Sequence, residues 1–298
     1  MLDRRRFTTA VLATAGACLV SGDKVFAQGN AGWPERLAAS LQSLETERGG
    51  RLGVAVVDTK NGQQGGYRTE ERFPICSTFK LLAVAALLTR VDRGNEQLER
   101  RIRFETADLV VNSPVTKNRA GGDGMTLAEI CEAAMTFSDN TAGNLLLATL
   151  GGPEGLTAYA RSLGDSVTRL DRIEPDLNEA VPGDPRDTTS PSAMLSNIRT
   201  LVAGNTLASA SKERLIGWLA GNKTGDARLR GGLPRDWRVG DKTGAGERGT
   251  TNDVAVIWPA PGRPPLFVSV YLTGSSPDGE HRNATVRSVG AVIGSSFA

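Results

Sequence analysis

Histidine and cysteine are scarce in this chain. Its 298 residues include one histidine, His281, and three cysteines, none of them in a C-x-x-C pair. A zinc site would have to use carboxylates almost alone, so the sequence argues against zinc, and we expect no cofactor. A Ser-His-Asp triad would have to use His281, which is better explained as a polar residue near a helix start. A serine nucleophile in this chain should therefore take Lys and Glu as its bases.

The chain also lacks an apolar run typical of a retained membrane span. Three arginines at positions 4–6 precede a short segment, 7–20, that is rich in Ala and Thr. Small residues ending at Ala27 offer a cleavage site, and the arginines resemble a twin-arginine export signal. We interpret residues 1–27 as a signal peptide, which predicts an exported protein, periplasmic or secreted, without stable membrane association.

Excess charge of either sign is missing as well. Of the 35 basic and 33 acidic residues, four and two lie in the signal, so the mature chain has 31 of each. A formal net charge of zero gives no case for a nucleic-acid or anionic-membrane partner. A small-molecule substrate and a monomer are the simpler expectations. Cys76 and Cys131 remain after cleavage, and the sequence does not decide whether they form a disulfide.

Patterning predicts strands at both ends of the chain and helices between them. We expect strands at 51–58, 64–68, 237–241, 253–259 and 265–273, and helices at 34–48, from 77 onward, 126–135, 142–150, 153–163, 192–203, 209–220 and 283–293. One sheet built from both ends, flanked by terminal helices, is an α+β fold. Residues 28–72 and 221–298 should form an α/β lobe, and residues 73–220 an inserted helical lobe.

Ser77 and Lys80 open a helix whose next residues, 81–88, are all apolar. A helix that is apolar all round is buried, so its first turn should face the interior. Residues three apart share a helix face, so the hydroxyl and the amine should meet. Desolvation disfavours the ammonium form and makes the amine a better proton acceptor, which can activate a serine. The S-x-x-K motif alone is common by chance and is better explained by a capping serine and a surface lysine.

Two further motifs follow in order, Ser138-Asp139-Asn140 and Lys242-Thr243-Gly244. S-x-x-K, S-D-N and K-T-G together are the signature of class A β-lactamases and penicillin-binding proteins. The segment 172–178 (R-I-E-P-D-L-N) closely resembles the omega loop of class A β-lactamases, here residues 171–187. The chain thus resembles class A β-lactamases over its mature length. This resemblance implies a five-stranded antiparallel sheet and hydrolysis of β-lactam antibiotics, which confers resistance.

The resemblance also implies how the chemistry is divided among the residues. Ser77 attacks the ring carbonyl, and its proton goes to Lys80 or, through water, to Glu174; both routes remain open. The backbone N–H groups of Ser77 and Ala245 should bind the oxyanion. Ser138 should relay a proton to the leaving ring nitrogen.

The omega loop should then supply the second step. Glu174 can activate the deacylating water, and Asn178, four residues on, can hold that water from another side. The resemblance further suggests that Arg172 pairs with Asp187 across the neck of the loop and that Glu174-Pro175 is a cis bond. Without the other motifs, this stretch would fit a solvated acidic loop.

β-Lactams carry a carboxylate, which cations and hydroxyls can bind. Lys242 and Thr243 supply one of each, and Arg228 matches a placement seen in some class A members. Many members instead carry an arginine on the next strand, where Thr251 stands here. Asn140 should hold the substrate's side-chain amide and help orient the S-x-x-K lysine.

Other positions depart from the common class A pattern. Asn112 stands where an aromatic residue often walls the pocket. Many members bridge Cys131 to a cysteine at the position of Val84, so we expect Cys131 to be a free, buried thiol. Some carbapenem-hydrolysing members form a disulfide between the cysteine before the nucleophile and a cysteine just after the K-T-G strand. Here the second position is Gly246, so Cys76 should not form that disulfide.

Three other functions share part of this pattern. A penicillin-binding protein or D-alanyl-D-alanine peptidase would use the same serines and lysines but deacylate slowly. A sensor domain would bind a β-lactam and stay acylated. An esterase of related architecture would prefer short esters.

Overall fold

The computed structural model describes the unit of residues 32–298. The predicted signal peptide, its cleavage site near Ala27 and the start of the predicted α/β lobe at residues 28–31 lie outside the described residues. No helix among residues 32–298 is long and apolar enough to cross a membrane.

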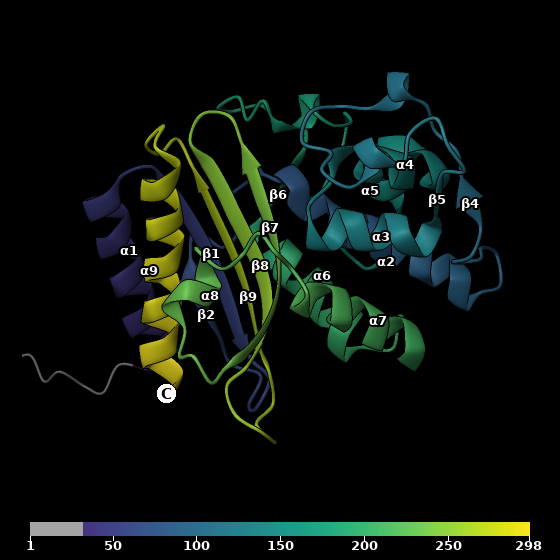
Figure 1. Ribbon diagram of the computed structural model, residues 1–298. Helices are drawn as coiled ribbons and strands as arrows, with labels where there is room; N and C mark the ends of the chain where they lie inside the picture. Colours follow the sequence, from purple (N-terminus) through teal and green to yellow (C-terminus); the bar gives the residue numbers. More distant parts are fainter. Residues whose placement is uncertain (1–31) are drawn as a thin grey trace, which may run out of the picture. The chain divides into compact units, whose positions relative to one another are not determined.

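A five-stranded sheet divides this unit, and every neighbouring pair of its strands is antiparallel. The strand order is β2-β1-β9-β8-β7 (Figure 1). The strands are β1 (Arg51–Asp58), β2 (Gln64–Tyr67), β7 (Arg238–Gly246), β8 (Thr250–Trp258) and β9 (Leu266–Thr273). The three central strands are buried along almost their whole length, because helices cover both faces of the sheet. The predicted α+β fold with a five-stranded antiparallel sheet is confirmed.

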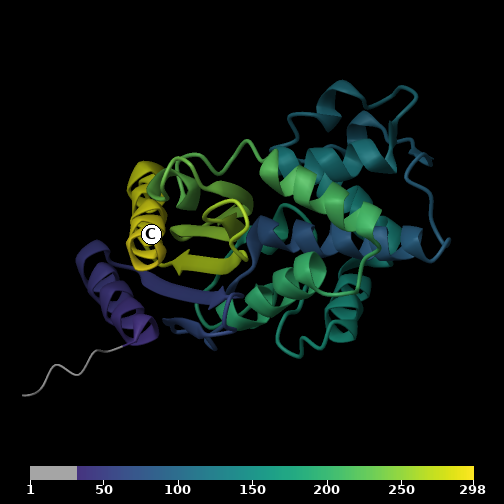
Figure 2. The same ribbon diagram turned by 90° about the horizontal axis from the view of Figure 1, so that it is seen from below.

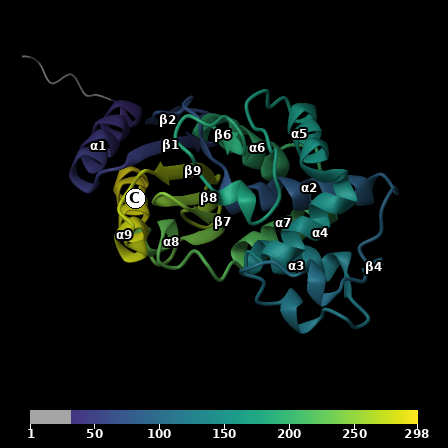
Figure 3. The same cartoon turned by 90° about the horizontal axis from the view of Figure 1, so that it is seen from above.

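The two terminal helices cover one face of the sheet. Helices α1 (Trp33–Arg48) and α9 (Gly279–Phe297) lie side by side on it, with the short helix α8 (Leu229–Gly232) beside α9 (Figures 1 and 3). Leucines of α1 and branched residues of α9 pack on the strands there as a separate apolar core. This packing brings the two ends of the described chain together, as the pattern of strands predicted.

A group of helices covers the opposite face. Helix α2 (Phe79–Asp92) runs through its middle, and its first eleven residues are all buried (Figure 2). An apolar helix surface on all sides requires neighbours on all sides, and five other helices contact it. The helices of this group are α2, α3 (Leu127–Thr136), α4 (Asn140–Leu150), α5 (Gly152–Ser162), α6 (Pro191–Ala203) and α7 (Ser209–Ala220).

Several boundaries differ from the sequence prediction. Helix α4 begins at Asn140 and not at residue 142, because the Asp139 side chain caps it by accepting from the Ala142 N–H at 2.9 Å. Strand β7 continues past residue 241, because the K-T-G motif stays paired with β8. Helix α9 is longer at both ends than 283–293, starting after the Asp278 cap with His281 in its first turn. Short strand pairs, β3 (Phe73–Pro74) with β6 (Thr188–Thr189) and β4 (Arg101–Ile102) with β5 (Met125–Thr126), were not predicted.

The Asp187 carboxylate makes three contacts across the neck of the omega loop, residues 171–187. Asp187 accepts hydrogen bonds from the backbone N–H groups of Asp171 at 2.8 Å and Arg172 at 3.0 Å. Its second oxygen lies 2.6 Å from the Arg172 guanidinium. The predicted ion pair is therefore present, and the Glu174-Pro175 bond is cis as expected. A single turn of 3-10 helix at Asp176–Asn178 lies inside the loop.

Candidate active site

Ser77 lies in a turn of 3-10 helix, η1 (Cys76–Thr78), that leads directly into α2. Lys80 follows within the first turn of α2, and its ammonium donates to the Ser77 hydroxyl at 2.8 Å. Lys80 is fully buried and Ser77 is 7% exposed. The η1 turn contacts β7, β8 and the omega loop, so the start of this apolar helix faces the interior as predicted.

The Lys80 ammonium has four oxygen partners at short distance. Besides Ser77 Oγ, these are Asn140 Oδ1 at 2.7 Å, the Ser138 carbonyl at 2.9 Å and Glu174 Oε1 at 2.9 Å. Burial lowers the pKa of the Lys80 ammonium, and the Glu174 carboxylate opposes that shift. The site thus holds an amine that is easier to deprotonate than a surface lysine, in contact with a serine hydroxyl.

Glu174 is directed inward from the omega loop. Its Oε1 lies 3.1 Å from the Ser77 hydroxyl, and its Oε2 accepts from the Asn178 side-chain amide. The backbone of Glu174 is fixed by Asn144 of α4, whose amide donates to the Glu174 carbonyl and accepts from its N–H, both at 2.9 Å. The buried Asn178 Oδ1 has no hydrogen-bond partner among the described residues. Asn144 was not predicted; it lies four residues after Asn140, on the same helix face.

Lys242 reaches the site from the sheet. Its ammonium donates to Ser138 Oγ at 2.9 Å and to the Thr243 carbonyl at 2.8 Å. Burial lowers the pKa of Lys242 well below its usual range, and the positive charges of Lys80 and Arg228 add to that effect. Ser138 sits in the left-handed region, with φ of 56°, between α3 and α4. The S-D-N turn therefore places Ser138 between the two lysines.

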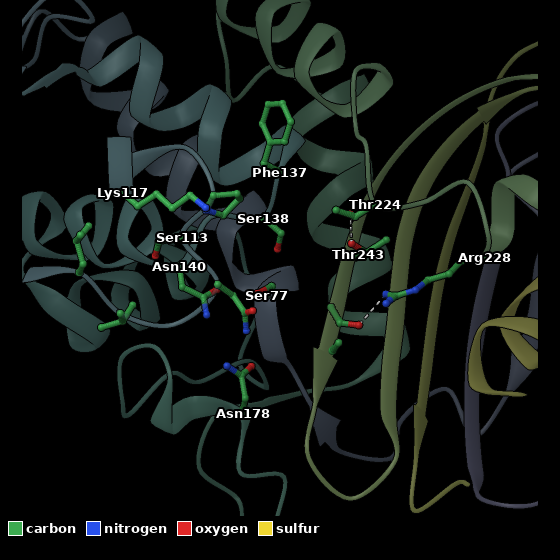
Figure 4. Close-up of a pocket in the computed structure, with 16 residues that line it drawn as sticks. Ser77, Ser113, Lys117, Phe137, Ser138, Asn140, Asn178, Thr224, Arg228 and Thr243 are labelled. Carbon is green, nitrogen blue, oxygen red and sulfur yellow. Dashed lines mark hydrogen bonds between the residues drawn. The ribbon is translucent and has the colours of Figure 1, made fainter. Parts of the chain in front are cut away.

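These residues meet in a cleft of about 710 Å³ between the helical group and strand β7 (Figure 4). Eight of the predicted site residues line this cleft: Ser77, Asn112, Ser138, Asn140, Asn178, Arg228, Thr243 and Ala245. The other three, Lys80, Glu174 and Lys242, are buried against its lining through the contacts given above. Lys117, Phe137 and Thr224 also line it and were not predicted.

Arg228 is more deeply embedded than its predicted role requires. Its guanidinium donates to the Gly244 carbonyl at 2.8 Å (Figure 4). It also donates to the Asn252 carbonyl at 2.8 Å and to Asn283 Oδ1 at 3.0 Å. Burial lowers its pKa. Arg228 therefore ties β7 to β8 while lining the cleft. Thr251 lies opposite Ala245 on β8.

Both described cysteines are free and buried, as expected for Cys131. Burial raises the pKa of each thiol. Cys76 lies under strand β7, where a Cβ added to Gly246 would approach its Sγ to 2.7 Å. A glycine at position 246 thus allows the strand to lie close to the nucleophile turn.

Comparisons with known proteins show which family the chain belongs to. The model of the "Beta-lactamase enzyme family" matches residues 36–297. Beta-lactamase CTX-M-8 of Citrobacter amalonaticus is 43% identical, over 98% of this chain and 99% of the relative. Beta-lactamase AST-1 of Nocardia asteroides is 46% identical, over 98% of this chain and 95% of the relative. The solved structure of an ancestral (GNCA) class A β-lactamase is 60% identical with a TM-score of 0.86, covering 88% of this chain and all of that one. The chain belongs to the β-lactamase enzyme family and, within it, to the class A β-lactamases.

Proposed function

We propose that this protein hydrolyses the β-lactam amide bond through a serine acyl-enzyme and so confers β-lactam resistance. The observation that carries this proposal is the position of the Ser77 hydroxyl, 2.8 Å from Lys80 Nζ and 3.1 Å from Glu174 Oε1. Two buried basic groups beside one hydroxyl can serve two successive proton transfers without a histidine.

In the first step Ser77 attacks the lactam carbonyl. Either Lys80 or Glu174 can take its proton, since both lie within hydrogen-bond reach. The backbone N–H groups of Ser77 and Ala245 stabilise the oxyanion. Ser138, which accepts from the Lys242 ammonium, passes a proton to the ring nitrogen as the amide bond breaks.

In the second step water attacks the acyl-enzyme. Glu174 is the base for this water, and its contact with Asn178 keeps the carboxylate directed at the serine. Asn178 Oδ1, in the same loop, has no hydrogen-bond partner among the described residues and can accept a hydrogen bond from that water. Asn144 holds the backbone of the base from outside the loop, so the base does not depend on the loop alone for its position.

The substrate is held at both ends of the cleft. Lys242, Thr243 and Arg228 bind its carboxylate on the sheet side. Asn140 takes the acyl side-chain amide on the helical side, where its own Nδ2 donates to the Val111 carbonyl at 3.0 Å. Asn112 gives this wall a polar side chain in place of an aromatic ring.

We further propose that the protein is exported, acts in the periplasm or outside the cell after cleavage near Ala27, and works as a monomer without stable membrane association. We also propose that the chain has two lobes that meet at the cleft: an α/β lobe of residues 28–72 and 221–298 and a helical lobe of residues 73–220.

Turnover of a chromogenic cephalosporin by the purified mature protein tests the proposal. We expect many turnovers per active site. A single stoichiometric burst would instead indicate a penicillin-binding protein or a sensor, and faster cleavage of short esters than of lactams would indicate an esterase.

A further inference from the structure

A line of hydrogen bonds leads from the interior of the protein to the cleft-facing hydroxyl of Thr243. Its inner end is Asp241, a fully buried carboxylate on β7 that is paired with Arg230. Asp241 Oδ2 accepts from the Asn222 side-chain amide at 2.6 Å. A carboxylate can only accept, so this contact fixes which end of the Asn222 amide faces Asp241. The Asn222 oxygen is therefore directed away from Asp241.

That oxygen is used by Thr224. Asn222 Oδ1 accepts from the Thr224 backbone N–H at 3.0 Å and from the Thr224 hydroxyl at 2.8 Å. The Thr224 hydroxyl is also hydrogen-bonded to the Thr243 hydroxyl. Both threonines line the cleft (Figure 4). The segment that carries Asn222 and Thr224 lies close against the sheet, since a Cβ added to Gly225 would approach Asp241 Oδ2 to 1.9 Å.

The number of available protons decides which group donates and which accepts in each of these hydrogen bonds. A threonine hydroxyl has a single proton. While Thr224 gives its proton to Asn222, the contact between the two hydroxyls must use the proton of Thr243. In this arrangement Thr243 presents only lone pairs to the cleft, which would repel a carboxylate.

The hydrogen bond between the two threonine hydroxyls can also have the opposite direction. If the Thr224 hydroxyl rotates and donates to Thr243, the Thr243 proton becomes free to point into the cleft. Asn222 Oδ1 still accepts from the Thr224 N–H in that state, so no buried acceptor is left without a partner. In both states every buried acceptor keeps a partner, and a negative charge in the cleft favours the second state.

We propose that Thr224 is a positioning residue for substrate recognition: when the β-lactam carboxylate enters, the Thr224 and Thr243 hydroxyls reverse, and Thr224 supports the hydrogen bond that Thr243 donates to the carboxylate. This inference rests on the proposed function, because it concerns how that substrate is bound. Thr224 acts through Thr243, and Asn222, held by Asp241, keeps Thr224 in place. The effect should appear in substrate binding and should depend on the charge of the carboxylate.

The test compares a cephalosporin with its methyl ester, which keeps the ring system and removes the charge. We expect Thr224→Val to raise KM for the acid roughly three- to tenfold, the equivalent of about one hydrogen bond, with kcat within about twofold. KM for the ester should change by less than about twofold, because charge-assisted hydrogen bonds are the stronger ones. Thr224→Ser should restore the acid KM, and Thr106→Val, at an exposed threonine outside the cleft, should leave it unchanged.

A double-mutant cycle with Thr243→Val completes the test. The two substitutions should be non-additive on the acid KM, because each removes the same line of hydrogen bonds. An unchanged acid KM in Thr224→Val, an equal rise for acid and ester, or additivity with Thr243→Val would each overturn the inference. Failure of the wild-type protein to turn over the acid would instead contradict the proposed function, so the two failures are distinguishable.

Discussion

Lys80 and Glu174 form a buried ion pair: Lys80 Nζ lies 2.9 Å from Glu174 Oε1, and neither side chain is exposed to solvent. Desolvating two charges is costly, and their attraction offsets that cost only while both are present. The pair also brackets the Ser77 hydroxyl, which contacts both atoms. Removing either charge therefore changes the chemistry at Ser77 and leaves the other charge buried without its partner.

Glu174→Gln should stop the reaction after acylation. The amide keeps the size of the side chain but cannot deprotonate water, so we expect kcat to fall about 10²- to 10⁴-fold. Intact-mass spectrometry should show the acylated protein accumulating within one turnover time. Asp176→Asn, at an exposed carboxylate of the same loop, is the matched control and should turn over normally. Unchanged steady-state turnover in Glu174→Gln would reject the role of Glu174.

Lys242 should make the free energy of unfolding depend on pH. Burial lowers its pKa in the folded state well below 10.5, while the unfolded chain keeps an ordinary lysine pKa. Between these two values the unfolded state binds more protons, so the contribution of Lys242 to stability rises with pH across that window and is complete above 10.5. Below the window the folded state carries the full cost of a buried ammonium.

Urea unfolding of the wild type and Lys242→Met at pH values from 7 to 10 measures this contribution. The difference between the two proteins should shift in favour of the wild type as pH rises. Lys242→Arg is the control, because arginine stays charged over the whole range and should not show the rise. If the difference in unfolding free energy between the wild type and Lys242→Met stayed constant with pH, the prediction would be wrong.

Asp187→Asn should loosen the neck of the omega loop. The substitution removes the charge that pairs with Arg172 and one of the oxygens that accept there, and it leaves polar groups without partners at a site that is 1% exposed. We expect a loss of about 1–3 kcal/mol in unfolding free energy and slower deacylation, since Glu174 lies in this loop. Asp184→Asn breaks the exposed Arg186–Asp184 pair of the same loop and should change little. Equal effects of the two substitutions would contradict a special role for the neck.

Arg228→Ala should separate two functions of one side chain. Loss of carboxylate binding should raise KM for penicillins about tenfold or more, equivalent to about 1.4 kcal/mol per factor of ten. Loss of the bonds to the Gly244 and Asn252 carbonyls should lower Tm for the free protein. Arg228→Lys keeps a charge without the planar fork and should recover part of the KM effect only. A lower Tm with an untouched KM would mean that Arg228 only ties the strands together.

Local features of the fold were largely predictable because their causes are local. A capping box of Thr126 and Glu129 forms at the start of α3, within one residue of the predicted helix 126–135, and α7 has the predicted bounds. The misjudged boundaries have causes outside the pattern of apolar residues. Strand β7 extends because β8 pairs with it, and two-residue strands such as β3 form only where distant segments meet. A period of 2 or 3.6 cannot be detected in two residues.

The site was predictable as a set of motifs, but not as a set of contacts. The motifs named Ser77, Lys80 and Glu174, whereas the clamp by Asn144 has no motif of its own. The strand-bracing contacts of Arg228 were also not foreseen, because they depend on where the turn before α8 packs on the sheet.

The amino-acid sequence by itself indicated the kind of chemistry, because the S-x-x-K, S-D-N and K-T-G motifs and the segment 172–178 occur together in a chain with one histidine. It also determined the long helices and the five strands of the main sheet, since periodicity and caps act over a few residues. Only the tertiary structure decided that Ser77 and Glu174, 97 positions apart, share a hydrogen bond, and that Asp241 orients Asn222 beneath Thr224. Such distances follow from how whole helices pack on the sheet, which no short stretch of residues specifies.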